Sequence, residues 1–331
     1  MAANNAYTSH TLVDLVVRKN PDGRLAPIVE VLNTINDIFP DIYMTEANDK
    51  TSHLHTQRVN LGTPTIRRIG LGVAASKPNE KQIRDSVMLT EAWCEVDERL
   101  VRLSRDPAGY RRGKDMAFVE GFLQTMAGYV IDGSGRDEEM YGFSARLASI
   151  GTYCITASGS GSDLTSMYFV EWSESGVFGL FPAGSGGGFE MDVKAIDTDK
   201  DSSNRLMDVY RTKFQWDMGI GLAHPKALYR IANIDTSSIS SLAESSLPAI
   251  DDLLLYCAAK GRVRTPGPLG GRYIYGNSDA MIILDRLAKD KTNVWYKPGQ
   301  PFGYDPAGTA SFRGTLVHQV EAITSTETAI S

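Results

Sequence analysis

The segment Gly276-Asn277-Ser278-Asp279-Ala280 has the residue types of a serine nucleophile held on a tight turn. It is a near match to the Gly-x-Ser-x-Gly nucleophile elbow, and it lies between a predicted strand and a predicted helix, as that motif requires. Asp305 and His318 follow in the chain order Ser, Asp, His, so Ser278, Asp305 and His318 form a candidate catalytic triad. A serine hydrolase is therefore one alternative for this chain.

Two features of the surrounding sequence weigh against that triad. The chain before Gly276 lacks the alternating strand and helix pattern of an α/β-hydrolase, and no His-Gly-Gly loop is present to form an oxyanion hole. The run from Asn277 to Asp279 is explained more simply as an N-cap cluster for the helix that follows it. We therefore expect no catalytic residues.

His53 and His55 lie two residues apart, which on a strand places both imidazoles on one face and could pair them on a metal. No third ligand accompanies them in the sequence, so we expect both to be solvated ribbon residues. The run from Gly70 to Ala75 fits a loose dinucleotide fingerprint, but Lys77-Pro78-Asn79 breaks the helix that must follow it. We predict neither a metal site nor a cofactor site.

A second glycine run, from Gly184 to Gly188, lacks the Lys-Ser/Thr ending of a phosphate-binding loop and is predicted to be a turn. Cys94, Cys154 and Cys257 are odd in number and widely spaced, and they lie among apolar neighbours. We expect buried free thiols, as in a reducing compartment.

Composition sets wider limits on function. The 331 residues are 42% hydrophobic and 22% charged, which suffices for a substantial core. The net charge of −6 argues against a protein that binds nucleic acid by neutralising phosphates. No secretory leader pattern and no apolar run of about 18 residues occurs, so we expect a protein made and kept in the cytoplasm, or in a particle assembled there.

Apolar spacing then predicts the elements that would carry these residues. We expect an amphipathic helix over residues 25–39, a polar two-stranded ribbon over 50–79, and a long helix over 114–131 that ends at the glycines after Asp132. Later elements are a hairpin of 166–170 with 176–181, a strand at 210–218, a helix over 246–260, a basic loop over 262–271, a strand at 273–276, a helix over 280–288 and a terminal strand over 312–323.

Three stretches in this order resemble the major capsid proteins of tailed bacteriophages with the Hong Kong 97-type fold, particularly those of short-tailed phages. One is the long helix with YVIDGSGRDEEMYGFSARL, similar to the spine helix and glycine-rich return of that family. Another is VYRTKFQWDMGIGLAHPKALYRIANID, similar to its aromatic strand. The last is ASFRGTLVHQVEAITSTETAI, similar to its closing strand.

The resemblance implies an α+β fold with four parts. These are an N-terminal arm at 1–49, an extended β-ribbon loop at 50–82, a peripheral domain at 83–246 and 311–331 with the spine helix at 114–131, and an axial domain at 247–310.

The resemblance also implies a function. The protein would assemble in the host cytoplasm into the pentamers and hexamers of an icosahedral virion shell around double-stranded DNA. It would need no cofactor and no membrane. Its partners would be its own copies, a separate scaffold protein, the portal and cement or decoration proteins. Some members of the family form covalent Lys-Asn cross-links, but nothing in this sequence identifies such a pair. Another virion protein, of the tail tube or of decoration type, is a further alternative.

Overall fold

The computed structural model describes residues 36–136, 138–200, 204–239, 250–261, 271–289, 296–297, 310–312 and 314–331. The predicted helix over 25–39 lies almost wholly outside these residues, as does the basic loop over 262–271. The chain divides into two compact units. The described residues of the first lie within 89–126 and 187–217, and those of the second lie within 36–88, 127–186 and 218–331.

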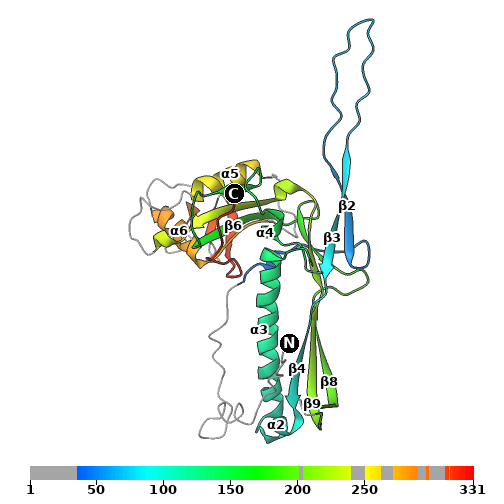
Figure 1. Ribbon diagram of the computed structural model, residues 1–331, viewed down its shortest axis with the longest axis vertical. Coiled ribbons are helices and arrows are strands. Elements are labelled where there is room, and N and C mark those ends of the chain that lie inside the picture. Colours follow the sequence, from blue (N-terminus) through cyan, green and yellow to red (C-terminus); the bar gives the residue numbers. More distant parts are fainter. Residues whose placement is uncertain are drawn as a thin grey trace. The chain divides into compact units, whose positions relative to one another are not determined.

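The first unit is a helix packed along an antiparallel sheet (Figure 1). The sheet has the order β4 (Glu91–Asp97), β9 (Leu206–Trp216), β8 (Phe189–Lys200), and α2 (Glu98–Leu103) follows β4. The predicted alternation is confirmed within β9, because Thr212 and Phe214 are buried while their neighbours are partly exposed. The predicted end of that strand at 218 is wrong, because β9 stops at Trp216 and Met218 begins a strand of another sheet. Phe214 stacks on Phe118 of the helix, with ring centroids 5.7 Å apart.

That helix is α3, Pro107–Asp132, which begins seven residues earlier than predicted. Its first turn contains Pro107, and the Asp106 carboxylate accepts a hydrogen bond from the Gly109 amide at 2.9 Å. Both are features of a helix N-terminus. The apolar stripe starts only in the second half of the helix, which is why its spacing predicted a later start. Phe122, Met126 and Val130 of the stripe are buried.

The second unit contains a five-stranded sheet with the order β1 (Met44–Glu46), β7 (Val177–Phe181), β10 (Met218–Leu222), β3 (Glu80–Met88), β2 (Ser52–Arg58). The predicted hairpin of 166–170 with 176–181 is wrong, because β6 (Leu164–Glu171) belongs to another sheet. Both segments are almost entirely buried, so each needs its own neighbours. The Trp172–Val177 bridge between them is parallel, not the antiparallel pairing of a hairpin.

The same unit has a seven-stranded sheet covered by two helices. Its order is β13 (Tyr296–Lys297), β14 (Ala310–Phe312), β15 (Thr315–Gln319), β12 (Arg272–Gly276), β6, β11 (Leu228–Asp235), β5 (Cys154–Thr156). The helices are α5 (Ile250–Lys260) and α6 (Ser278–Lys289), and both pack their apolar faces into one core cluster with the sheet. The predicted terminal strand over 312–323 is instead split into β14 and β15, with Gly314 at a positive φ of 78° between them.

Short elements complete this unit: α4 (Phe143–Arg146), η1 (Phe39–Asp41), η2 (Pro225–Ala227) and η3 (Ser237–Ile239). The turn from α3 into α4 depends on two glycines. The Gly142 amide donates to the Gly133 carbonyl at 2.9 Å, and a Cβ on Gly133 would lie 2.4 Å from the Met140 carbonyl oxygen. This close approach fixes the start of α4 and therefore the position of Arg146. None of the described helices is long and apolar enough to cross a membrane.

Candidate functional site

The ribbon formed by β2 and β3 carries a long exposed loop, residues 59–79. The two strands pair antiparallel from Ser52 opposite Ser86 to Arg58 opposite Glu80. Beyond that ladder, residues 59–79 run out from the sheet as two extended segments joined by a turn (Figure 1). The predicted ribbon is therefore present, although its hydrogen-bonded strands lie at 52–58 and 80–88 and the glycines lie in the loop between them.

The loop at 59–79 exposes apolar side chains that the chain itself does not bury. Ile66 is 92% exposed and Ile69 is fully exposed, and four more large apolar residues share this exposure: Val59, Leu61, Leu71 and Val73. Contiguous apolar exposure of this kind marks a surface that another molecule covers.

The ribbon also differs from the rest of the chain in charge. Residues 50–84 hold seven Lys or Arg side chains and one Glu, a formal charge of +6. Since the whole chain carries −6, the remaining residues carry −12. The ribbon is therefore suited to an acidic partner surface.

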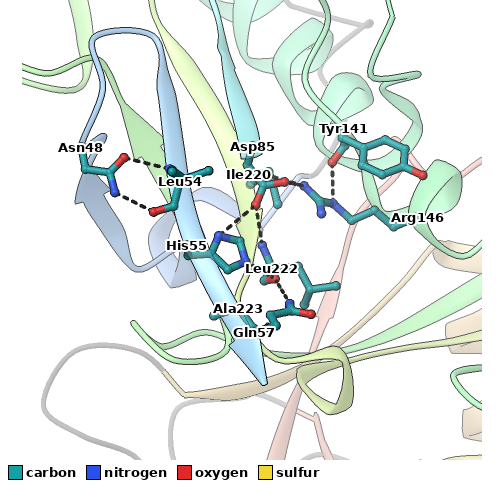
Figure 2. A network of polar contacts seen from close by, with 10 residues as sticks. All are labelled: Asn48, Leu54, His55, Gln57, Asp85, Tyr141, Arg146, Ile220, Leu222 and Ala223. Atoms are coloured by element: carbon teal, nitrogen blue, oxygen red, sulfur yellow. Dashed lines mark hydrogen bonds and ion pairs between the residues drawn. The ribbon is translucent and has the colours of Figure 1, made fainter. Parts of the chain in front are cut away.

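A network that we call the ribbon anchor holds the base of this ribbon: Asn48, His55, Gln57, Asp85 and Arg146 (Figure 2). Arg146 Nη2 donates to Asp85 Oδ1 and to the Ile220 carbonyl, both at 2.7 Å, and Nε donates to the Tyr141 carbonyl at 2.9 Å. The side chains of Asp85 and Arg146 are only 3% and 7% exposed. A buried, multiply bonded ion pair ties β3 to the α4 turn.

The β2 side of the ribbon anchor uses Asn48, His55 and Gln57. Asn48 donates to the Leu54 carbonyl at 2.7 Å and accepts from the Leu54 amide at 2.8 Å. Gln57 Nε2 donates to the carbonyls of Leu222 and Ala223, at 2.9 and 2.8 Å, and His55 Nε2 lies 3.0 Å from the same Leu222 oxygen. The contacts of His55 and Gln57 join β2 to the end of β10, with which it shares no ladder.

The prediction that His53 and His55 are solvated is wrong. Their rings do lie on one face of β2, with centroids 6.1 Å apart, but both pack edge-on against Phe178. Nδ1 of each ring is buried without a hydrogen-bond partner among the described residues. Burial, followed by the neighbouring His55, lowers the pKa of His53 from its ordinary value. Within the part of the chain that the structure describes, no three His, Cys, Asp or Glu side chains group closely enough to hold a metal ion.

Of the candidate triad, the structure describes Ser278 and His318, and each of them has another partner. The Ser278 amide donates to Glu321 Oε1 at 3.0 Å, whereas His318 Nδ1 lies 2.7 Å from Asp41 Oδ2. Asp305 lies outside the described residues. The simpler interpretation of this segment is confirmed, because Asn277 Oδ1 accepts from the Ala280 amide at 3.0 Å and caps α6.

His318 instead belongs to a buried polar chain. Asp41 also accepts from the Tyr275 hydroxyl at 2.8 Å, and that hydroxyl accepts from Trp172 Nε1 at 2.7 Å. This chain links η1 to β12 and β15, and the Asp41 Oδ2 atom that His318 contacts also accepts from Tyr275. A structural role therefore accounts for His318.

The three cysteines are free and buried, as predicted. Burial raises the pKa of Cys94 and of Cys257 to about 12, which keeps both thiols protonated and unreactive near neutral pH.

Comparison with known proteins identifies relatives of this chain. The family model for the major capsid protein GP7 matches residues 20–331. The solved structure of bacteriophage Epsilon15 shares 27% sequence identity, covers 99% of each chain and superposes with a TM-score of 0.76. The capsid of bacteriophage JBD30 is less similar, at 9% identity and a TM-score of 0.48 over 88% of this chain and 93% of that one. None of the curated proteins compared with the chain matches it. The chain therefore belongs to the major capsid protein GP7 family and has a Hong Kong 97-like fold.

Proposed function

We propose that this phage major capsid protein builds an icosahedral shell from pentamers and hexamers of itself, and that the shell encloses double-stranded DNA. The family match over residues 20–331 is the observation that carries the proposal. The protein is a virion component, and structures of this family are assembled from multiple copies. Contact with the packaged DNA is weak and non-specific in this proposal, because a chain of net charge −6 repels phosphates on average.

Within that shell, we assign the ribbon, residues 50–82, to contact with a neighbouring copy. The exposed apolar side chains of its loop favour such a contact, since their burial against a second subunit removes them from water. Charge supports the same partner, because residues 50–84 carry a formal charge of +6 and the rest of each copy is acidic. Residues 1–49 form the arm, 83–246 and 311–331 the peripheral domain, and 247–310 the axial domain in this assignment.

Assembly in the host cytoplasm, around a separate scaffold protein and onto a portal, completes the proposal, with cement or decoration proteins added to the outside. It is tested by expressing the full chain with the scaffold protein of its phage, followed by negative-stain electron microscopy and sedimentation velocity. We expect closed shells tens of nanometres across, or rings of five and six subunits. A stable monomer or dimer under every assembly condition would overturn the proposal.

A further inference from the structure

Two imidazoles occupy the contact between the ribbon base and the rest of its sheet. His53 and His55 alternate with the exposed Leu54 and Thr56 on β2, so both rings turn toward β7 and β10. Phe178 of β7 meets both, with ring centroids 5.3 Å and 6.2 Å away. Figure 2 shows His55 between Asp85 and the chain at Leu222.

The two imidazoles and the other bonds of the ribbon anchor together tie this end of the ribbon to the sheet. β2 is an edge strand whose ladder is with β3, and β3 pairs with β10 at Val87 and Met88. The packing of the two imidazoles on Phe178 therefore acts beside the bonds of Gln57 in holding β2 against its sheet. A change in their charge acts where the ribbon joins the sheet.

Most of the charged groups around His53 and His55 already have partners of their own. Asp85 of β3 is the cross-strand neighbour of His53 and lies 3.7 Å from His55 Nδ1, but its carboxylate already accepts bonds from Arg146 and from the Leu222 amide. The backbone of Glu46, in β1, is hydrogen-bonded to His53. The carboxylate of Glu46 accepts a hydrogen bond from the Gly184 amide. The nearby Arg84 pairs with Asp49 at 3.7 Å. β7 contributes the apolar ring of Phe178, and β10 contributes a backbone carbonyl.

We propose that the His53–His55 pair is a proton-sensitive hinge for the ribbon: neutral rings keep the base of β2 packed on its sheet, and protonation loosens it. One proton places a charge against Phe178, and a second places two like charges about 6 Å apart beside Arg146, with the single carboxylate of Asp85 to balance them. The repulsion between the two charges disfavours the packed arrangement, because Asp85 is already paired with Arg146.

The direction of the pH effect follows from the same contacts. Burial lowers the pKa of His53 in the packed base below its ordinary value of 6.5. The loosened base therefore binds protons more readily than the packed one, so packing is strongest above that value and weakens as the pH falls through the region below it. The hinge is a property of the subunit itself, whereas any change that it makes to a shell rests on the proposed function.

Hydrogen–deuterium exchange on the full chain tests the hinge. We compare exchange at about pH 7.5 and about pH 5, corrected for intrinsic rates, in peptides that cover 52–58 and 80–86. Protection of these peptides should fall by about fivefold or more at the lower pH, while peptides of β6 and β11 keep theirs. In the double variant His53→Gln/His55→Gln, which cannot titrate, the two pH values should give equal protection.

The single variants His53→Gln and His55→Gln keep the test decisive if the double variant does not fold, since each should reduce the pH response. His318→Gln is the matched control, because it removes an imidazole from the other sheet and should leave the ribbon response intact. Equal protection of the wild-type ribbon at both pH values, or a full response in the double variant, would overturn the hinge. Because the readout is the subunit's own amides, either outcome is separate from whether shells form.

Discussion

At the scale of single residues, the ion pair of His318 stabilises the folded protein more at low pH than at high pH. The bond to Asp41, more than the other nearby groups, raises the pKa of His318 above its ordinary 6.5 against the opposing effect of burial. A raised pKa in the folded state contributes stability that is complete below the unfolded value of about 6.5 and is lost as the pH rises through the folded value.

We therefore expect His318→Gln to cost about 1–2 kcal/mol at about pH 6, with a clearly smaller cost at about pH 9. Urea unfolding of both proteins at several pH values measures the difference. A cost that stays constant or grows with pH would contradict the assignment of the ion pair to Asp41 and His318.

A second residue-scale prediction concerns the ion pair of the ribbon anchor. Arg146→Met leaves Asp85 buried and unpaired, so we expect a loss of about 3–5 kcal/mol in the free energy of unfolding. Adding Asp85→Asn should recover part of that loss, because the uncompensated charge is then gone. Urea titration is the measurement.

The matched control is Arg58→Met, since Arg58 pairs with Glu80 on the same ribbon but both side chains are more than half exposed. Its cost should stay below about 1 kcal/mol. Equal costs for the two arginine variants would show that burial does not decide the strength of the ribbon anchor.

Residue-scale sequence patterns predicted single contacts unevenly. Asn277 caps α6 as expected, because N-cap chemistry is local. The serine, aspartate and histidine order at Ser278 and His318 was misleading, since chain order says nothing about which side chains meet. The pairing of Asp85 with Arg146 was not predicted. The lone acidic residue between Ile83 and Val87 in a strand is the sequence feature that indicates one half of this pair.

At the scale of elements, α3 depends on the few side chains that it buries. Phe122 is 9% exposed and meets Phe189 edge-on at 5.6 Å. We expect Phe122→Ala to destabilise the protein by about 3–5 kcal/mol through the cavity that it leaves. Met116, on the same helix but 55% exposed, is the control, and its replacement by Ala should change stability by less than about 0.5 kcal/mol. Thermal and urea unfolding would measure both, and equal losses would contradict the assigned inner face of α3.

Elements with one buried face were predictable and those with two were not. The alternation in β9 and the stripe of α3 each report one covered side. β6 and β7 are buried on both sides, so their sequences carry no alternation and do not reveal which strands they join. β8 was missed although Met191 and Val193 alternate with acidic residues, because the irregularity between Val193 and Ile196 ends that alternation early.

At the scale of the whole molecule, the loop beyond the ribbon ladder is separable from folding. Its residues form no ladder, and Val59 and Asn79 already meet, with the Val59 amide donating to the Asn79 carbonyl at 2.9 Å. Replacing residues 60–78 with Asn-Gly should therefore give a tight hairpin and a folded subunit that forms no closed shells.

Circular dichroism, urea unfolding and electron microscopy of the assembly reaction check this expectation. Replacing Thr63 and Thr65 with Ser keeps the length and charge of the loop and is the control, which should assemble normally. Normal shells from the shortened chain would refute the role of the loop in contact between copies.

The exposed loop also allows trypsin cleavage to detect whether a second copy covers it. Arg67 and Arg68 stand side by side in the loop, both exposed, and form a ready cleavage site for trypsin. A cut there leaves two fragments still joined by the ladder from Ser52 to Arg58, so the nicked subunit stays in one piece. If a second copy covers the loop, the free subunit is nicked rapidly and the assembled one is spared, and the surviving full-length band counts the occupied contacts in a population of particles.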